Sequence, residues 1–463
     1  MTEQSREPSF SKSYVETLFG QFAFQALGVL ASLLAARILG PEGRGELAAV
    51  CYYPILVSML GSLSLSQAVA FATSRTGKNG TAVLAAGLVL ALVIGLPQTV
   101  LCVLFLPSTL PTNLSHLSSI VQYYSLFPLL TYCLGVFSGR DEGLFAFSRF
   151  YLFLGLQSAG NCLGIVLAWL GGVASVAILA ASQIISGMAV LTSRLFIARS
   201  DFISARPNAD TARTLLRQGT AFHFPQVAAI IAGQADMLLA VTLLPPEQLG
   251  FYVVALAIAR GQLGFVSALV QVSFVRIAGT ADRSAAIATL VQVFKASQVV
   301  AIAIATLFIL ATPLMLEYGF GSSFLQAKSV TIWLVAAVAL AGVYHILDQG
   351  LRALGHSFVS TTGNVFVVAV QLGAGYAIVP RTGIEAIAYL KCAGHLLAIL
   401  MVCLHLVFFQ KVTARNLIPD RSTVRQLSST AFRLLASFER VNTVAERACP
   451  RLVRTLKSVV KPR

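Results

Sequence analysis

Residues 33–50 read LLAARILGPEGRGELAAV, and residues 238–255 read LLAVTLLPPEQLGFYVVA. An offset of 205 residues aligns the two segments without a gap and gives seven identities in 18 positions. Each segment closes one apolar run, crosses a short turn that contains Pro-Glu-x-x-Gly, and opens the next apolar run. We interpret the two segments as copies of one duplicated unit. The identities are Leu33, Leu34, Ala35, Leu39, Pro41, Glu42 and Gly45, matched by Leu238, Leu239, Ala240, Leu244, Pro246, Glu247 and Gly250.

Long apolar runs fill the chain on both sides of these segments. Of the 463 residues, 57% are hydrophobic and 11% are charged, and the mean hydropathy is +0.80. Each run is long enough for a spanning helix of roughly 20 residues, whereas barrel strands would have about ten residues of alternating polarity. The sequence therefore predicts an all-α polytopic membrane protein with about 12 transmembrane helices. The runs are 19–38, 47–72, 81–105, 120–139, 150–169, 173–196, 219–244, 250–275, 292–314, 330–351, 357–379 and 386–409.

The duplication divides the predicted helices into two units of six. Because each unit has an even number of spans, both units enter the membrane in the same orientation. Parallel repeats of this kind are related by an axis along the membrane normal, enclose a central cavity and work by alternating access. The expected divisions are a cytoplasmic N-terminus at 1–18, an N-terminal lobe at 19–196, an inter-lobe loop at 197–218, a C-terminal lobe at 219–409 and a tail at 410–463.

Lysine and arginine are divided unevenly between the loops on the two sides. If the N-terminus is cytoplasmic, the inside segments before the tail hold 14 of these residues and the outside loops hold three, which are Arg44, Lys328 and Arg381. Cytoplasmic loops of membrane proteins carry an excess of Lys and Arg. We therefore expect both termini in the cytoplasm. The first 18 residues are polar, and no cleavage motif follows the first apolar run, so that run predicts a span rather than a signal peptide.

The tail at 410–463 is the most basic segment. It holds 12 Lys or Arg residues and three acids, and its apolar residues recur at helical spacing. Basic amphipathic helices bind anionic lipids of the inner leaflet, and we expect this of the tail; a solvated tail with no task is the alternative. The net charge of +15 is thus explained by loops and tail, and no nucleic-acid partner is expected.

The turn residues Pro, Glu and Gly have the same spacing in both copies of the repeat, and their chemistry favours structural roles. Proline cannot continue a helix, glycine permits a tight loop, and a glutamate favours the positive N-terminal end of the next helix. We expect these roles for six structural repeat-loop residues: Pro41, Glu42, Gly45, Pro246, Glu247 and Gly250.

Four basic residues fall inside the predicted spans, where an ionised side chain costs about 2.5–3.5 kcal/mol. Arg260 lies near the middle of the eighth span, and we expect it to face the cavity and bind substrate; a structural ion pair is the alternative. Arg37, Lys295 and Lys391 are further candidates for the cavity, although snorkelling to the membrane surface also explains them. His395 lies one helical turn from Lys391 and adds to a polar face.

Acidic residues and a histidine inside the spans are candidates for ion pairing or coupling. Asp236, in the seventh span, is expected to pair with Arg260 or Arg37, or to carry a coupling proton. His345 and Asp348 lie three residues apart in the tenth span, so they can contact each other and titrate near neutral pH.

The repeat segments also carry a family resemblance. The sequence ARILGPEGRGELA at Ala36–Ala48 and the LxPExxGFY pattern at Leu244–Tyr252 resemble the polysaccharide-biosynthesis exporters. These are the Wzx-type flippases of the multidrug/oligosaccharidyl-lipid/polysaccharide exporter superfamily. The likeness spans about residues 12–410 and includes Gln234-Ala-Asp-Met-Leu-Leu and Gly319-Phe-Gly-Ser-Ser-Phe. The basic tail lies outside this pattern.

The resemblance implies transport of an undecaprenyl-pyrophosphate-linked oligosaccharide from the cytoplasmic to the periplasmic leaflet of a bacterial inner membrane. The product would be a surface polysaccharide such as lipopolysaccharide or exopolysaccharide, and a polymerase or glycosyltransferases would be partners. The excess of cations inside the spans suits a pyrophosphate, because arginine binds phosphate through a planar fork of donors. The alternative is an ion-coupled small-molecule antiporter of the multidrug kind, for which organic cations would favour the opposite charge.

Enzyme classes find little support in the sequence. It has no phosphate-binding Gly-Lys loop, and its seven cysteines are not spaced for a metal. The longest predicted outside loop, 106–119, has no ionisable residue except His116, which argues against a membrane glycosyltransferase or O-antigen polymerase. We therefore expect no enzyme, no cofactor and no metal.

Overall fold

A computed structural model of the protein describes residues 10–76, 80–110, 112–204, 208–264, 282–423 and 425. Every regular element in this part of the chain is helical, which confirms the all-α prediction. The first half contains α1 (Phe10–Gly61), α2 (Leu65–Thr76), α3 (Thr81–Thr109), η2 (Thr112–Leu117), α4 (Ser118–Tyr124), α5 (Phe127–Gly143), α6 (Phe147–Leu170), α7 (Val176–Ile197) and α8 (Arg199–Ser204). The second half contains α9 (Ala209–Leu243), α10 (Pro246–Arg260), α12 (Arg283–Leu314), η3 (Met315–Phe320), η4 (Ser322–Ala327), α13 (Lys328–Ala353), α14 (Ser357–Val368), η5 (Ala369–Gly373), α15 (Ala374–Thr382), α16 (Glu385–Gln410) and η6 (Ala414–Leu417).

Ten helical segments of the described chain are long and apolar enough to cross a membrane. One of them, Gly20–Gly61, consists of two arms joined at Gly40, whose φ of 68° lies in the left-handed region. Across this joint, Arg44 Nη2 donates to Ser32 Oγ at 3.2 Å, although residues 12 apart in a straight helix lie about 18 Å apart. The chain therefore reverses at Gly40. The two arms of α1 match the first two expected spans, and α10, of which 15 residues are described, matches the start of the eighth; residues 265–275 of that span lie outside the described residues.

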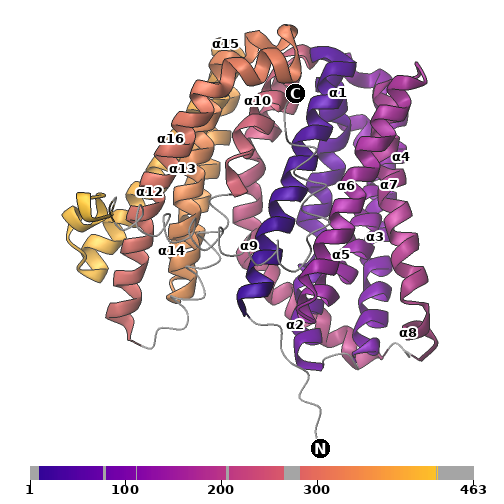
Figure 1. The fold of residues 1–463 in the computed structure, drawn as a ribbon, viewed down its shortest axis with the longest axis horizontal. Helices are drawn as coiled ribbons and strands as arrows, with labels where there is room; N and C mark the ends of the chain where they lie inside the picture. Colours follow the sequence, from indigo (N-terminus) through magenta and orange to yellow (C-terminus); the bar gives the residue numbers. More distant parts are fainter. Residues whose placement is uncertain are drawn as a thin grey trace, which may run out of the picture.

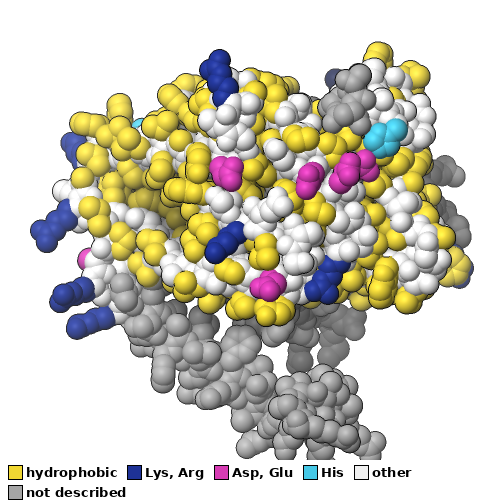
Figure 2. All heavy atoms as spheres, turned by 90° about the horizontal axis from the view of Figure 1, so that it is seen from above, with side chains coloured by type: hydrophobic (Ala, Val, Ile, Leu, Met, Phe, Trp, Pro, Cys, Tyr) yellow, Lys and Arg dark blue, Asp and Glu magenta, His cyan; other side chains and the backbone are white. Residues whose placement is uncertain are grey.

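Successive spans run in opposite directions between two ends of the bundle (Figure 1). One end, called the Gly40 end, holds Gly40 and the connection between α9 and α10; the other, called the α8 end, holds α8 and the connections after α5 and α13. In Figure 1, α1 to α8 form one bundle and α12 to α16 form the other, with α9 and α10 between them. Figure 2 shows the Gly40 end, where acidic and basic side chains are scattered singly among apolar and neutral ones.

The two copies of the repeat contact each other at the Gly40 end. A Cβ atom at Gly45 would collide with the carbonyl oxygen of Pro246, and one at Gly250 would collide with that of Pro41. Because the offset of 205 matches Pro41 and Gly45 with Pro246 and Gly250, the contact is reciprocal, as in any two-fold interface. Both glycines lie inside helices, so they permit close approach of two backbones. The tight turn that we expected them to permit is made in the first copy by Gly40.

The prolines and glutamates of the repeat begin the helices that follow. Pro246 is the first residue of α10, where its missing N–H is not needed, and Glu247 lies in the first turn at the positive end of the helix dipole. Pro41 and Glu42 stand directly after the joint at Gly40 and so begin the second arm of α1 in the same way.

The expected loop at 197–218 is helical over most of its length. It contains α8 and the first three turns of α9, which begins where the Asn208 side chain accepts a hydrogen bond from the Asp210 N–H at 2.9 Å. Leu215 is fully buried in a cluster that includes residues of α2 and α3, the helices that α9 contacts there, and Ala212 and Leu216 pack against the same cluster. We expected a loop because the segment is rich in basic residues, but its apolar residues also recur at helical spacing. Most of the tail, 424 and 426–463, lies outside the described residues, and so does its predicted surface helix.

Candidate substrate and coupling site

A buried ion pair joins two helices of the second half. Asp236 Oδ2, on α9, lies 2.5 Å from Lys391 Nζ, on α16. It also accepts a hydrogen bond from the Tyr252 hydroxyl, on α10, at 2.8 Å. Asp236 is 0% exposed and Lys391 is 5% exposed. Among the described residues, Asp236 Oδ1 has no hydrogen-bond partner, so this oxygen can accept a further hydrogen bond.

Lys391 and His395 share one buried face of α16. The Nδ1–H of His395 donates to the carbonyl oxygen of Lys391 at 2.8 Å, and the His395 ring lies 6.1 Å from the ring of Tyr344, on α13. Both side chains are buried within the second half. Snorkelling therefore does not account for Lys391, whose ammonium group is held by Asp236.

Arg260 is the last described residue of α10 and is exposed. It lies near enough to Asp236 and Lys391 to interact electrostatically with both. Asp236 therefore pairs with Lys391, and not with Arg260 or Arg37 as we expected from the sequence. The error arose because partners on helices far apart in the chain depend on packing. Among the described residues Lys391 already neutralises Asp236 and no carboxylate forms an ion pair with Arg260, so Arg260 adds a positive charge beside the pair.

Arg37 lies at the Gly40 end and connects the two halves. Its guanidinium donates to the backbone carbonyls of Tyr318 and Gly319, with Nε 2.5 Å from the Gly319 oxygen. These carbonyls belong to the end of η3, in the second half. Tyr318 and Gly319 are far along the chain from Arg37. The hydrogen bonds to their carbonyls use the guanidinium donors that we had assigned to a substrate.

Lys295 is held in a different place from the ion pair. Its Nζ lies 3.4 Å from Asp420, in the segment that follows α16, and it lines a pocket that Arg37, Arg260 and Lys391 do not line. The four cations predicted for the cavity therefore do not gather there. Lys391 and Arg260 are near each other, whereas Arg37 and Lys295 have partners elsewhere.

Asp348 is buried at the α8 end of α13, and its partners differ from the expected one. It forms an ion pair with Arg352, at 3.2 Å, and accepts hydrogen bonds from Ser360 and from Asn364 Nδ2, the latter at 3.0 Å. His345 is exposed and makes none of these hydrogen bonds, although it lies near enough to Asp348 to interact with it electrostatically. The spacing of three residues permitted a contact with His345, but the carboxylate points to α14.

A neutral pocket of about 270 Å³ lies at the break between α1, which ends at Gly61, and α2, which begins at Leu65. Two consecutive residues in the break, Leu63 and Ser64, have left-handed φ values of 46° and 48°. His223, on α9, stabilises the break because its Nε2–H donates to the Leu60 carbonyl at 2.8 Å and its Nδ1 lies 3.3 Å from Ser64 Oγ. Most of the lining side chains carry a hydroxyl or an amide, namely Ser58, Ser62, Ser64, Ser66, Gln67, Thr131, Tyr132 and Gln226.

The neutral pocket is connected to the ion pair through α9. Gln234 Nε2 lies 3.4 Å from the sulfur of Met59, which lines the pocket. The carbonyl oxygen of Gln234 accepts a hydrogen bond from Tyr52 at 3.1 Å, and Asp236 follows two residues later. The residue that contacts the pocket, Gln234, and the residue that forms the ion pair, Asp236, are thus neighbours on α9.

Sequence reasoning missed a third buried carboxylate, Asp141, at the α8 end of α5. Arg149 Nε, on α6, donates to Asp141 at 2.6 Å, and Arg194, on α7, donates to its other oxygen. The Arg194 guanidinium also stacks on the Phe153 ring, 3.7 Å from its centroid.

A second internal repeat would have revealed Asp141. GVFSGRDEGL at 135–144 and GVYHILDQGL at 342–351 share five of ten residues at an offset of 207, and the matched acids are Asp141 and Asp348. This offset of 207 is close to the offset of 205 in the first repeat, so both matches belong to the same duplication.

Comparison with known proteins agrees with the class that this fold defines, a multi-pass membrane protein built like transporters and flippases. The sequence profile of the family described as "Polysaccharide biosynthesis protein" matches residues 12–280, more than half of the chain. The chain belongs to this polysaccharide biosynthesis family of the exporter superfamily, as the sequence resemblance indicated. A search of the curated proteins gave no match.

Solved structures share the fold at low sequence identity. An inward-facing multidrug resistance MATE family transporter of the MOP superfamily is 18% identical with a TM-score of 0.67, and the alignment covers 87% of this chain and 100% of that one. The lipid II flippase MurJ, in an inward closed conformation, is 13% identical with a TM-score of 0.66, covering 87% and 89%. A MOP superfamily transporter from Pyrococcus furiosus is 17% identical with a TM-score of 0.60, covering 87% and 97%.

Proposed function

We propose that the protein is an alternating-access flippase that moves an undecaprenyl-pyrophosphate-linked oligosaccharide across the bacterial plasma membrane for surface polysaccharide synthesis. The family supports a role in polysaccharide biosynthesis, and the likeness to a lipid II flippase supports a lipid-linked glycan as substrate. In this proposal both termini and the α8 end face the cytoplasm, because the basic loop residues gather at that end.

The uncompensated charge of Arg260 is the observation that carries the proposal. Asp236 and Lys391 neutralise each other, so the exposed guanidinium of Arg260 leaves the cluster with a net positive charge. A guanidinium binds two phosphate oxygens at once, and such charge-assisted hydrogen bonds are roughly twice as strong as neutral ones. The pyrophosphate of the substrate is the group that this charge suits.

The sugars of the substrate fit the neutral pocket beside the break between α1 and α2. Hydroxyl and amide side chains line it, and its described lining contains no charged residue. Sugar hydroxyls can donate to the free lone pairs of these oxygens, and burying such donors unpaired is costly. Because Gln234 and Asp236 are neighbours on α9, the glycan and the pyrophosphate would then both lie beside this helix.

Transport requires that the contacts at the Gly40 end separate. The Pro41–Gly250 and Pro246–Gly45 contacts and the Arg37 hydrogen bonds join the two halves there. In the proposed cycle, substrate enters from the α8 end, these contacts break, and substrate leaves at the Gly40 end. Protonation of Asp236, whose Oδ1 has an unused acceptor, would release Lys391 and couple the change to a proton gradient.

The test is to replace Arg260 in cells that lack another exporter for the same glycan. Arg260→Ala is expected to lower export about tenfold to a hundredfold, since a hydrogen bond to a charged group contributes about 1.5–3 kcal/mol. Arg260→Lys keeps the charge without the fork and should fall in between. Arg381→Ala, at the Gly40 end, is the matched control and should export normally. Normal export by Arg260→Ala at an unchanged membrane level would refute the proposal.

A multidrug-type antiporter is the second candidate, because the MATE family transporter has the same fold over 87% of this chain. An uncompensated arginine disfavours the organic cations that such a pump would handle. Efflux of cationic dyes from cells that express the protein, abolished by Asp236→Asn, would favour this function over glycan export.

A further inference from the structure

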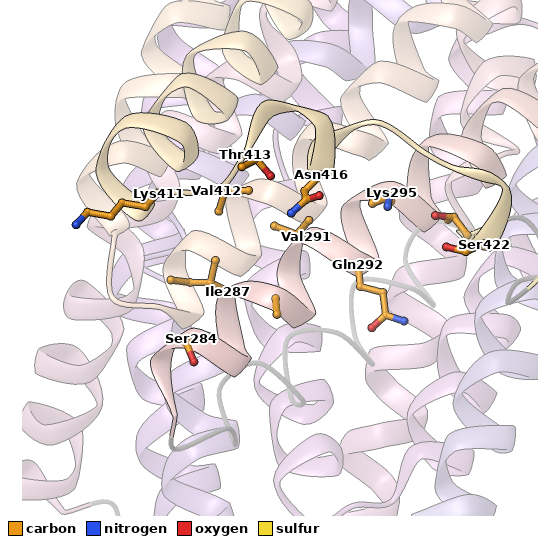
Figure 3. Close-up of a pocket in the computed structure, with 12 residues that line it drawn as sticks. Ser284, Ile287, Val291, Gln292, Lys295, Lys411, Val412, Thr413, Asn416 and Ser422 are labelled. Atoms are coloured by element: carbon orange, nitrogen blue, oxygen red, sulfur yellow. The ribbon is translucent and has the colours of Figure 1, made fainter.

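A pocket of about 470 Å³ lies between the start of α12 and the segment that follows α16 (Figure 3). Its α12 wall includes Ser284, Ile287, Val291 and Lys295. The opposite wall comes from residues 411–423, which turn back toward α12 after Lys411 adopts a left-handed conformation with φ of 56°. The volume is in the range of small-molecule sites. The described transport residues Asp236, Lys391 and Arg260 do not line it.

The segment at 411–423 is fixed to α12 rather than loosely apposed. Gln298 Nε2 donates to the Leu417 carbonyl at 3.0 Å, and the Leu417 side chain is buried in the main core. Lys295 pairs with Asp420 at 3.4 Å. Hydrogen bonds from Thr423 hold the pKa of the Asp420 carboxyl below its ordinary value, so this anchor remains ionised at neutral pH.

The charge around the pocket is strongly positive. Residues 283–295 and 411–423 together contain five basic residues, and Asp420 is the single acid among them. Asp420 is held by Lys295, Ser422 and Thr423 and is not a lining residue. Within the described lining, Lys295 and Lys411 are the charged groups, accompanied by neutral hydroxyl and amide side chains.

Apolar residues mark the pocket as lying at the boundary between hydrocarbon and headgroups. Phe408 and Phe409, the last aromatic residues of α16, are 73% and 74% exposed, and Ile418, in the docked segment, is 65% exposed. Exposed apolar side chains, Phe among them, beside basic ones are typical of segments at a membrane interface. The α12 wall of the pocket adds Ile287 and Val291, which give it an apolar floor beneath the lysines.

We propose that this pocket binds the phosphate headgroup of an anionic phospholipid from the leaflet at the α8 end, with the glycerol and the upper acyl chain against Ile287 and Val291. The net positive charge of the two segments, with Lys295 and Lys411 in the lining, attracts the phosphate, and the hydroxyl and amide groups of the lining donate to its oxygens. The bound lipid fastens the segment after α16 to α12 and so ties the start of the basic tail to the membrane. This site is independent of the substrate carried between the two halves.

The experiment measures lipid retention by the full-length protein with native mass spectrometry after exchange into phosphatidylglycerol or phosphatidylcholine micelles. Wild type should retain phosphatidylglycerol preferentially. Lys295→Gln with Lys411→Gln should lower that retention about 25-fold, because each lysine near an anionic headgroup contributes about a fivefold factor. The matched control, Lys328→Gln with Arg381→Gln at the Gly40 end, removes two charges elsewhere and should retain the lipid. Equal losses in both variants would overturn the proposal.

A second variant separates lipid binding from the Lys295–Asp420 anchor. Ala288 lines the pocket, and Ala288→Trp fills it without removing a lysine, so retention should fall while the melting temperature without lipid stays near that of wild type. Full retention by this variant would also overturn the proposal. Inorganic phosphate and glycerol phosphate at millimolar concentration should not displace the lipid. Displacement by either would identify a site for free phosphate instead.

Discussion

Asp141 and Asp348 occupy matching positions of the two halves, yet the two carboxylates are held in different ways. Asp141 binds two arginines that come from two other helices, Arg149 of α6 and Arg194 of α7. Asp348 binds one arginine, Arg352, which lies one turn later on its own helix. The duplication therefore kept the buried acid while its partners diverged. The ion pairs of Asp141 connect three helices, whereas the ion pair of Asp348 lies within one helix.

The hydrogen bonds that tie Asp348 to α14 have uncharged donors. Ser360 and Asn364, on α14, donate to Asp348, and hydrogen bonds between an uncharged donor and a charged acceptor contribute about 1.5–3 kcal/mol at most. The second half also carries the Asp236–Lys391 pair, for which the first half has Ala31 at the position matched with Asp236. We infer that the first half acts as the more rigid unit and that the second half holds the groups that change during transport.

Asp141→Asn is expected to give the largest loss of stability. It leaves Arg194, which is 6% exposed, as a buried cation without an anionic partner, and breaking a buried pair in this way costs about 3–5 kcal/mol. The measurement is thermal unfolding of the purified protein in detergent, together with the monodisperse fraction by size exclusion. The control is Asp201→Asn, which removes the charge of a more exposed carboxylate, the partner of Arg140. This variant should change stability little. A stability equal to wild type for Asp141→Asn would contradict the rigid role of the first half.

Asp348→Asn is expected to cost less, about 1–2 kcal/mol. The asparagine oxygen still accepts from Ser360 and Asn364, and Arg352 is only partly buried, so water solvates it when the charge is lost. The same unfolding measurement decides between the two halves. If Asp348→Asn destabilised the protein as much as Asp141→Asn, the difference in partners would have no energetic meaning.

How much of this could be read from the sequence depends on how local each interaction is. The number of helices follows from the length of the apolar runs, and the closeness of Lys391 and His395 follows from their spacing of one turn. The left-handed joint at Gly40 was not predicted, because we assigned the turn to the Pro-Glu-x-x-Gly residues that follow it. The helical start of α9 was missed because Arg213 and Arg217 lie among its apolar positions.

Pairing across the bundle could not be derived in the same way. Lys391 and Asp236 are 155 residues apart, and choosing between Lys391, Arg260 and Arg37 as partner requires the packing of α9 against α16. Lys295 presented the same difficulty, because its partner Asp420 lies in the tail. A comparison of the two halves beyond the first repeat would have recovered Asp141, since its match with Asp348 is visible in the sequence alone.

Hydrogen–deuterium exchange sharpens the comparison without a mutation. Amides of α6 near the α8 end are held by Arg149 and its ion pair, whereas those of α14 are held by neutral hydrogen bonds. Opening of α14 is expected to be easier by about 1.4 kcal/mol, which corresponds to exchange about tenfold faster. Peptides at the Gly40 ends of the same two helices are the internal control. Equal protection of α6 and α14 at the α8 end would show that the charge difference does not govern local opening.

Arg149→Leu makes the first half resemble the second by leaving Asp141 with a single arginine. Arg149 is 42% exposed at its side chain, and pairs that water reaches contribute about 0–1 kcal/mol, so this variant should give the smallest loss of stability. Arg194 keeps Asp141 neutralised and keeps its contact with Phe153. Unfolding of Arg149→Leu beside Asp141→Asn measures the two effects on one scale. A loss as large as that of Asp141→Asn would mean that the link between α5 and α6, and not the neutralisation of Arg194, makes the first half rigid.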